Sequence, residues 1–171
     1  IVGTFDSSSL ISSQRAMHEV NFNEISCEEL QNFEIEYNFR IDKTAIMHGF
    51  GCWFDITFEG STTHVVLSTS PDCPATHWYQ CRLLFNEPLA VNKGQFVYGS
   101  MKFVANEKFS FDITLTATLD GTDITTTNHI NLGDQVCTSE LVIIIIYCNI
   151  FLLLFPLMTI CSVMYCRFII I

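Results

Sequence analysis

One short segment holds the residues of this chain whose chemistry is most distinctive. Thr76, His77, Trp78 and Tyr79 follow one another directly, after a proline-containing stretch at residues 71–75. An imidazole titrates near neutral pH and can accept or donate a proton, and the face of an indole attracts a cation. Because a hydrophobic strand pattern runs into this segment, the sequence predicts a rigid loop that displays His77 and Trp78 at a strand end.

Other residue types that often perform chemistry lack the spacing that chemistry needs. The remaining histidines have no Cys, His or carboxylate partners at metal-ligand spacing, so we expect them to be structural or exposed and expect no metal site. Ser68 and Ser70 lack the context of a nucleophile elbow, so no hydrolase is indicated. The histidines in question are His18, His48, His64 and His129.

The eight cysteines form no C-x-x-C pair and no zinc-type spacing. No N-x-S/T sequon occurs, which disfavours a secreted domain. We therefore expect buried, reduced thiols rather than a disulfide framework.

Charge is distributed unevenly along the chain. All 18 acidic residues and seven of the eight basic ones precede residue 141, which gives that region a net charge of −11. An acidic region without a Lys/Arg cluster is a poor nucleic-acid binder, because neutralising phosphates supplies most of that affinity. Such a region suits a basic peptide better.

Alternation of apolar and polar residues predicts strands through most of the first 140 residues. The dipeptide Asp120-Gly121 predicts a hairpin turn, and Ser26 with Glu29 predicts a short capped helical turn at Cys27–Gln31. No G-x-G-x-x-G follows a strand, so no nucleotide-binding unit is expected. These patterns predict an all-β, antiparallel barrel or sandwich. Strands are expected at residues 33–41, 50–58, 64–69, 79–85, 95–105, 109–119 and 122–130.

Residues 141–165 differ sharply from the rest, because the run from Leu141 to Cys166 contains no charged residue. At about 1.5 Å per residue, a helix over 141–165 would be long enough to cross a bilayer core of roughly 30 Å. We therefore predict a C-terminal transmembrane helix at 141–165, or else a non-native apolar tail. The first domain then spans residues 1–135.

Four stretches together resemble the C-terminal β-barrel of the protein arginine N-methyltransferases, most of all the coactivator-associated (histone-arginine) branch. The most specific are Trp53-Phe54-Asp55 in an aromatic strand and the loop Thr76-His77-Trp78-Tyr79-Gln80. The resemblance covers nearly all of residues 1–135. Its other parts are residues 1–6, residues 20–22 with 28–30, and residues 48–55 with Gly60-Ser61.

The resemblance implies S-adenosylmethionine-dependent methylation of arginine in histones or other proteins, in the nucleus and cytoplasm. It assigns His77 as the catalytic residue, either as an acid/base or by positioning. It assigns substrate binding to three neighbours: Thr76 shapes the turn, Trp78 walls the arginine pocket, and Tyr79 lines the groove. Arginine has a pKa above about 12, so its nitrogen attacks a methyl group only after charge is localised and a proton leaves.

The departures from the family matter equally. The sequence lacks the N-terminal domain that binds S-adenosylmethionine, the loop with two glutamates that holds the substrate arginine, and the arm through which the family forms homodimers. We therefore expect no cofactor in this chain and no activity from it alone. The alternative hypothesis is a non-enzymatic β-sandwich binding module, anchored in a membrane by residues 141–165.

Overall fold

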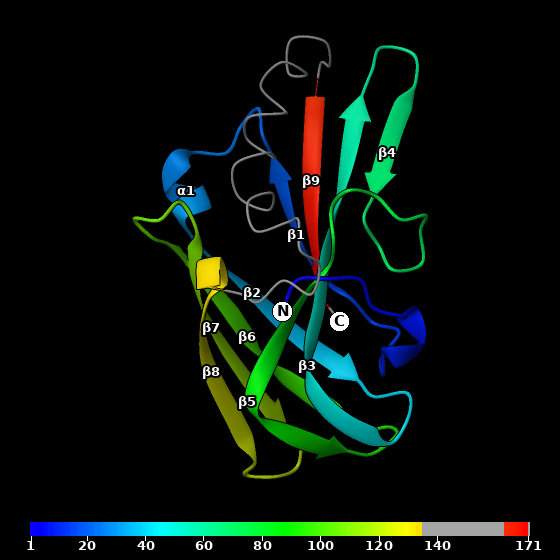
Figure 1. The fold of residues 1–171 in the computed structure, drawn as a ribbon, viewed down its shortest axis with the longest axis vertical. Helices are drawn as coiled ribbons and strands as arrows, with labels where there is room; N and C mark the ends of the chain where they lie inside the picture. The colour runs from blue at the N-terminus through cyan, green and yellow to red at the C-terminus, as the bar shows by residue number, and fades with distance from the viewer. Residues whose placement is uncertain (135–162, 171) are drawn as a thin grey trace.

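The strands pair into two antiparallel sheets in the computed structural model, which describes residues 1–134 and 163–170 (Figure 1). The upper part of the long strand β3, with its neighbours β9 and β4, extends beyond the second sheet. The first sheet has the order β1 (Ala16–Asn21), β9 (Val163–Ile170), β3 (Ala45–Glu59) and β4 (His64–Ser68), and β5 (Cys81–Val91) also pairs with β3. The second sheet has the order β2 (Asn32–Arg40), β6 (Phe96–Ala105), β7 (Phe111–Leu119) and β8 (Thr125–Asn131).

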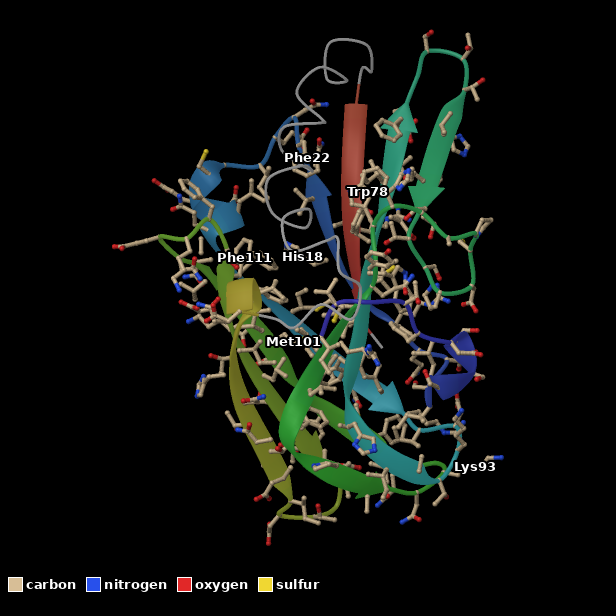
Figure 2. The ribbon with its side chains drawn as sticks, viewed as in Figure 1. His18, Phe22, Trp78, Lys93, Met101 and Phe111 are labelled. Carbon is tan, nitrogen blue, oxygen red and sulfur yellow. The ribbon has the colours of Figure 1, made fainter. Side chains whose placement is uncertain are left out.

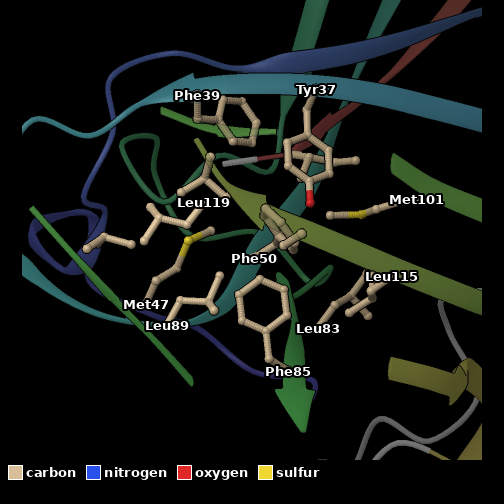
Figure 3. Close-up of a cluster of buried hydrophobic side chains, with 14 of the residues drawn as sticks. Tyr37, Phe39, Met47, Phe50, Leu83, Phe85, Leu89, Met101, Leu115 and Leu119 are labelled. Atoms are coloured by element: carbon tan, nitrogen blue, oxygen red, sulfur yellow. The ribbon is translucent and has the colours of Figure 1, made fainter. Parts of the chain in front are cut away.

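Alternation along the strands produces the main core between the two sheets. In β7, Ile113, Leu115 and Ala117 are buried, and the residues between them are more exposed. Phe50 of β3 meets the ring of Phe85 edge to face, at 5.2 Å between centroids. Figure 3 shows ten labelled members of this core: Tyr37, Phe39, Met47, Phe50, Leu83, Phe85, Leu89, Met101, Leu115 and Leu119.

The turns form as their sequences predict. Gly121 takes a positive φ of 76° between β7 and β8, where a residue with a side chain would be strained. The helix α1 (Cys27–Gln31) begins with a capping box in which the Glu29 amide donates to Ser26 Oγ (3.2 Å) and the Ser26 amide donates to Glu29 Oε2 (2.9 Å). These hydrogen bonds lower the pKa of Glu29. The short 3-10 helices η1 (Ser7–Ser9) and η2 (Leu132–Asp134) complete the elements.

The predicted fold class was wrong at its C-terminal end. Residues 163–165, the end of the expected transmembrane helix, belong to strand β9, which lies between β1 and β3 and pairs with both. Residues 141–162 lie outside the described residues. Within the described part of the chain, no helix is long and apolar enough to span a bilayer. The strand pairings there also define two separate sheets rather than one closed barrel.

The error has a physical cause in the position of β9. Ile169 packs against Trp53 and Ile170 joins the main core, so consecutive residues are buried on opposite faces of the sheet. A central strand covered on both faces can be as apolar as a membrane helix, so hydropathy gave no sign that a strand begins at residue 163. Arg167 lies at the exposed surface, where its Nε donates to Glu19 Oε2 at 2.5 Å.

Replacing Ile170 tests whether β9 completes this fold. The Ile170 side chain is only 2% exposed, so Ile170→Ala should lower the free energy of unfolding by about 2–4 kcal/mol. Ile124 is 53% exposed, and Ile124→Ala should change it by no more than about 0.5 kcal/mol. Urea denaturation of both variants measures the difference, and equal stabilities would argue against the placement of β9.

Candidate functional site

The loop that joins β4 to β5, residues 69–80, is fastened at both ends. The Thr69 amide donates to the Phe54 carbonyl (3.0 Å), and Thr69 Oγ1 donates to the same oxygen (2.8 Å) while accepting from the Phe54 amide (3.1 Å). At the other end, Gln80 Nε2 donates to the Thr69 carbonyl at 2.7 Å. Thr69 and Gln80 are both buried, so the loop closes on itself against β3.

The first half of the loop is a surface turn. The Cys73 amide donates to the Ser70 carbonyl (3.0 Å), and the Asp72 amide donates to Ser70 Oγ (3.3 Å). Asp72 also accepts a hydrogen bond from Arg15 (3.4 Å), whose guanidinium carbon lies 5.2 Å from the ring centroid of Trp53. These contacts tie the loop to the segment before β1.

The Thr76 hydroxyl closes the turn that contains His77. Thr76 Oγ1 donates to the Trp78 carbonyl (3.0 Å) and accepts from the Trp78 amide (3.2 Å). A threonine that satisfies the backbone two residues on is a common way to stabilise a tight turn. Thr76 therefore holds the turn in the structure, and its predicted part in binding a substrate stays a prediction.

Trp78 is a half-buried residue that packs on β3. Its ring meets Phe54 edge to face, with 6.2 Å between centroids, in a cluster with Ile56, Leu67 and Phe22 (Figure 2). Its Nε1 is buried and has no hydrogen-bond partner among the described residues. A buried indole N–H normally finds an acceptor, so a donor without one is unusual.

His77 and Tyr79 have opposite environments. His77 is exposed and makes no hydrogen bond or ion pair with another described residue. Tyr79 is half-buried and lines an apolar cavity of about 220 Å³ between the sheets, together with Phe103 and Ile170. The turn therefore separates the four predicted residues: Thr76 shapes it, Trp78 fastens it, Tyr79 borders the interior, and His77 is presented to solvent.

The structure also shows residues that the sequence analysis did not assign to the site. Thr69 and Gln80 hold the two ends of the loop, and the available signal was that both are polar residues beside strand ends. Asp55, one strand position from Phe54, accepts a hydrogen bond from Ser68 Oγ. Together these contacts make the loop rigid below the exposed His77.

No group of three or more potential metal ligands occurs in the part of the chain that the structure describes. His18 is stacked on Phe33 at 4.5 Å between centroids, and burial lowers its pKa. The other three histidines, His48, His64 and His129, are exposed. The four cysteines whose side chains are described are free thiols, and Cys27 and Cys73 are exposed rather than buried as expected.

Known proteins are similar to this chain over the region that contains the loop at residues 69–80. The family model described as the arginine methyltransferase oligomerization subdomain matches residues 1–122. The chain is 38% identical over 132 residues to the histone-arginine methyltransferase CARMER of Aedes aegypti, and 37% identical over 132 residues to that of Drosophila willistoni. The alignments cover 77% of this chain but only 22% and 25% of those relatives, so the chain spans about a quarter of their length.

A solved structure shares the fold. It is the Trypanosoma brucei PRMT1 enzyme-prozyme heterotetrameric complex with AdoHcy, with a TM-score of 0.61 and 20% sequence identity. The superposition covers 75% of this chain and 44% of that one. At this identity the likeness concerns the fold alone.

The different environments of His77 and Trp78 predict different effects on stability. His77→Ala should leave the free energy of unfolding within about 0.5 kcal/mol of wild type, because the side chain is exposed. Trp78→Ala should lower it by about 2 kcal/mol or more, because it removes the ring that packs on Phe54. Chemical denaturation measures both. A strongly destabilised His77→Ala would mean that His77 has a structural role.

Proposed function

Because this chain belongs to the arginine methyltransferase family through its oligomerization subdomain, we propose that it forms the substrate-facing β half of an enzyme that methylates arginine in histones or similar proteins. The observation that supports this most directly is the exposed His77, held on a rigid turn within the matched residues 1–122. The His77 side chain is accessible to a substrate, because it is exposed and no described residue forms a hydrogen bond or ion pair with it.

The chemistry of the turn suits a guanidinium. A neutral imidazole at His77 can accept the proton that leaves as the arginine nitrogen is methylated, or can orient the group that does so. Trp78 packs on Phe54, and the face of its indole is the part that would attract the cation. Thr76 sets the turn, and Tyr79 lines the apolar cavity between the sheets. In this assignment His77 is the catalytic residue, and Thr76, Trp78 and Tyr79 are the substrate-binding ones.

The methyl donor is proposed to bind elsewhere in the enzyme. When bound, S-adenosylmethionine would supply the electrophilic methyl group. The described residues do not fit this cofactor: each helical segment among them is five residues or shorter, and none follows a strand with a glycine-rich loop. The proposed function therefore requires a cofactor-binding domain beside this one, and the chain alone is expected to be inactive.

The net charge of the chain and the family to which it belongs indicate which partners it binds. The acidic character of residues 1–140 favours an arginine-rich protein segment over nucleic acid. The matched family is described as an oligomerization subdomain, so we propose that the complete enzyme pairs with a second copy. Its place of action is proposed to be the nucleus and cytoplasm, where histones and other arginine-containing substrates occur.

Replacing His77 in the complete enzyme tests its role. His77→Ala should reduce methylation of an arginine-rich histone peptide by at least about tenfold, which is the lower range for loss of an acid/base or positioning group. His64→Ala is the matched control, because His64 is also exposed but lies on the edge strand β4. Transfer of labelled methyl groups measures both variants, and wild-type turnover in His77→Ala would exclude His77 from the mechanism.

Calorimetry tests the proposed division between the two halves. The 171-residue chain should release no heat of binding with S-adenosylmethionine, whereas the complete enzyme should bind it. A micromolar site on this chain alone would contradict the proposal that the cofactor binds to another domain.

A further inference from the structure

Two cysteines face each other across the first sheet, immediately after the loop that ends at Gln80. Cys52 of β3 is the direct register partner of Cys81 of β5, and both strands run antiparallel. Directly opposed residues in such a pair point to the same face of the sheet. Both thiols accordingly border the same apolar cavity of about 220 Å³.

The backbone pattern gives the separation of the pair. The Gly3 amide donates to the Gln80 carbonyl (3.0 Å), and the Arg82 amide donates to the Ile1 carbonyl (2.8 Å). Successive residues of a strand direct their backbone groups to opposite sides, so those of Cys81 are directed towards β3. Cys52 and Cys81 thus form a hydrogen-bonded antiparallel pair, with Cα atoms about 5.5 Å apart. Disulfides most often join Cα atoms separated by about 5.5–6 Å.

Among the four cysteines whose side chains the structure describes, the surroundings favour a reaction between these two. Both pack against the main core, whereas Cys27 and Cys73 are exposed. On its other side, Cys52 is paired with Ile170 of β9, which cannot react with it. The thiols are free in the structure. Any oxidised form of one of them therefore has the other as its adjacent partner.

Burial also decides which thiol reacts first. It raises the pKa of both, and for Cys81 the charge of Arg82 offsets part of that rise. Since the thiolate is the nucleophile, Cys81 is the better first attacker, and its reaction with peroxide is slow at neutral pH.

We propose that Cys52 and Cys81 form a reversible disulfide when the protein meets hydrogen peroxide. The Cys81 sulfur attacks one peroxide oxygen, the O–O bond breaks, and the departing hydroxide takes a proton to become water. The Cys52 thiol then loses its proton and attacks the sulfenic sulfur of Cys81, which forms the S–S bond and releases a second water. Two thiols and one peroxide thus become one disulfide and two waters, with two electrons passing from sulfur to peroxide.

This bond would lock the loop that holds His77. Cys81 follows Gln80, the residue that closes the loop onto Thr69, and Cys52 lies two residues before Phe54, to which Thr69 is bonded. A covalent link across β3 and β5 adds to these hydrogen bonds at the base of the loop. The inference concerns regulation and does not depend on the proposed methyltransferase function.

Peptide mapping under non-reducing conditions tests the proposal on the 171-residue chain. After treatment with hydrogen peroxide and blocking of free thiols, cleavage after Glu59, Tyr79 and Glu87 places Cys52, Cys73 and Cys81 on three different peptides. We expect the Cys52 and Cys81 peptides to remain joined, two hydrogens lighter than their sum, until dithiothreitol releases them. Separate peptides with blocked or sulfinic cysteines, or peptides joined through Cys73, would overturn the proposal.

Variants and melting temperature complete the test. Cys73→Ser should retain the link, and Cys81→Ser should abolish it. The melting temperature of the oxidised wild type should rise by several degrees and return after reduction, while that of Cys81→Ser should not respond. A link without any rise in melting temperature would overturn the role as a lock.

Discussion

The pairing of the long strand β3 with its neighbours is the interaction on which the rest of this structure depends. One half of β3 places Phe50 in the core between the sheets and pairs with β5, and the other half pairs with β9 and β4. Its residues alternate between two covered faces, because Phe54 packs under Trp78 while Trp53 packs with Ile169. The loop at residues 69–80 is held on β3 because Phe54 offers both backbone groups to Thr69 and its ring to Trp78.

Much of this arrangement could be predicted from the sequence because the strands alternate regularly. The runs at residues 33–41, 95–105 and 109–119 match β2, β6 and β7 closely, and the Ser26–Glu29 capping box is confirmed. The family resemblance, inferred from Trp53-Phe54-Asp55 and from the loop at Thr76, is confirmed by the match over residues 1–122. Local patterns of this kind depend on near neighbours in the sequence, which is why they can be recognised without a structure.

What could not be predicted depends on contacts between distant residues. Strand β9 pairs with β1 across more than 140 residues, as in Glu19 with Arg167, and its first residues, 163–165, were predicted to end a membrane helix. The cover of Trp53 by Phe5 and Leu10 likewise follows from the path of the N-terminal segment, which no local pattern predicts. At the site, the motif located the turn, whereas the clamp between Thr69 and Gln80 joins residues 11 apart and leaves no periodic signal. The roles of Thr76, His77, Trp78 and Tyr79 in binding and catalysis stay predictions.

The loop separates stability from chemistry in a way that follows from burial. Thr69, Gln80 and the ring of Trp78 contribute to the packing and hydrogen bonds of the fold, so changes there cost folding free energy before they affect any reaction. His77 contributes nothing to that packing, because its side chain is exposed. The residue at position 77 can therefore be substituted while the turn that presents it is kept. The Cys52–Cys81 pair lines the interior cavity at the base of the loop. A disulfide there would change the rigidity of the turn and leave the exposed imidazole of His77 in place.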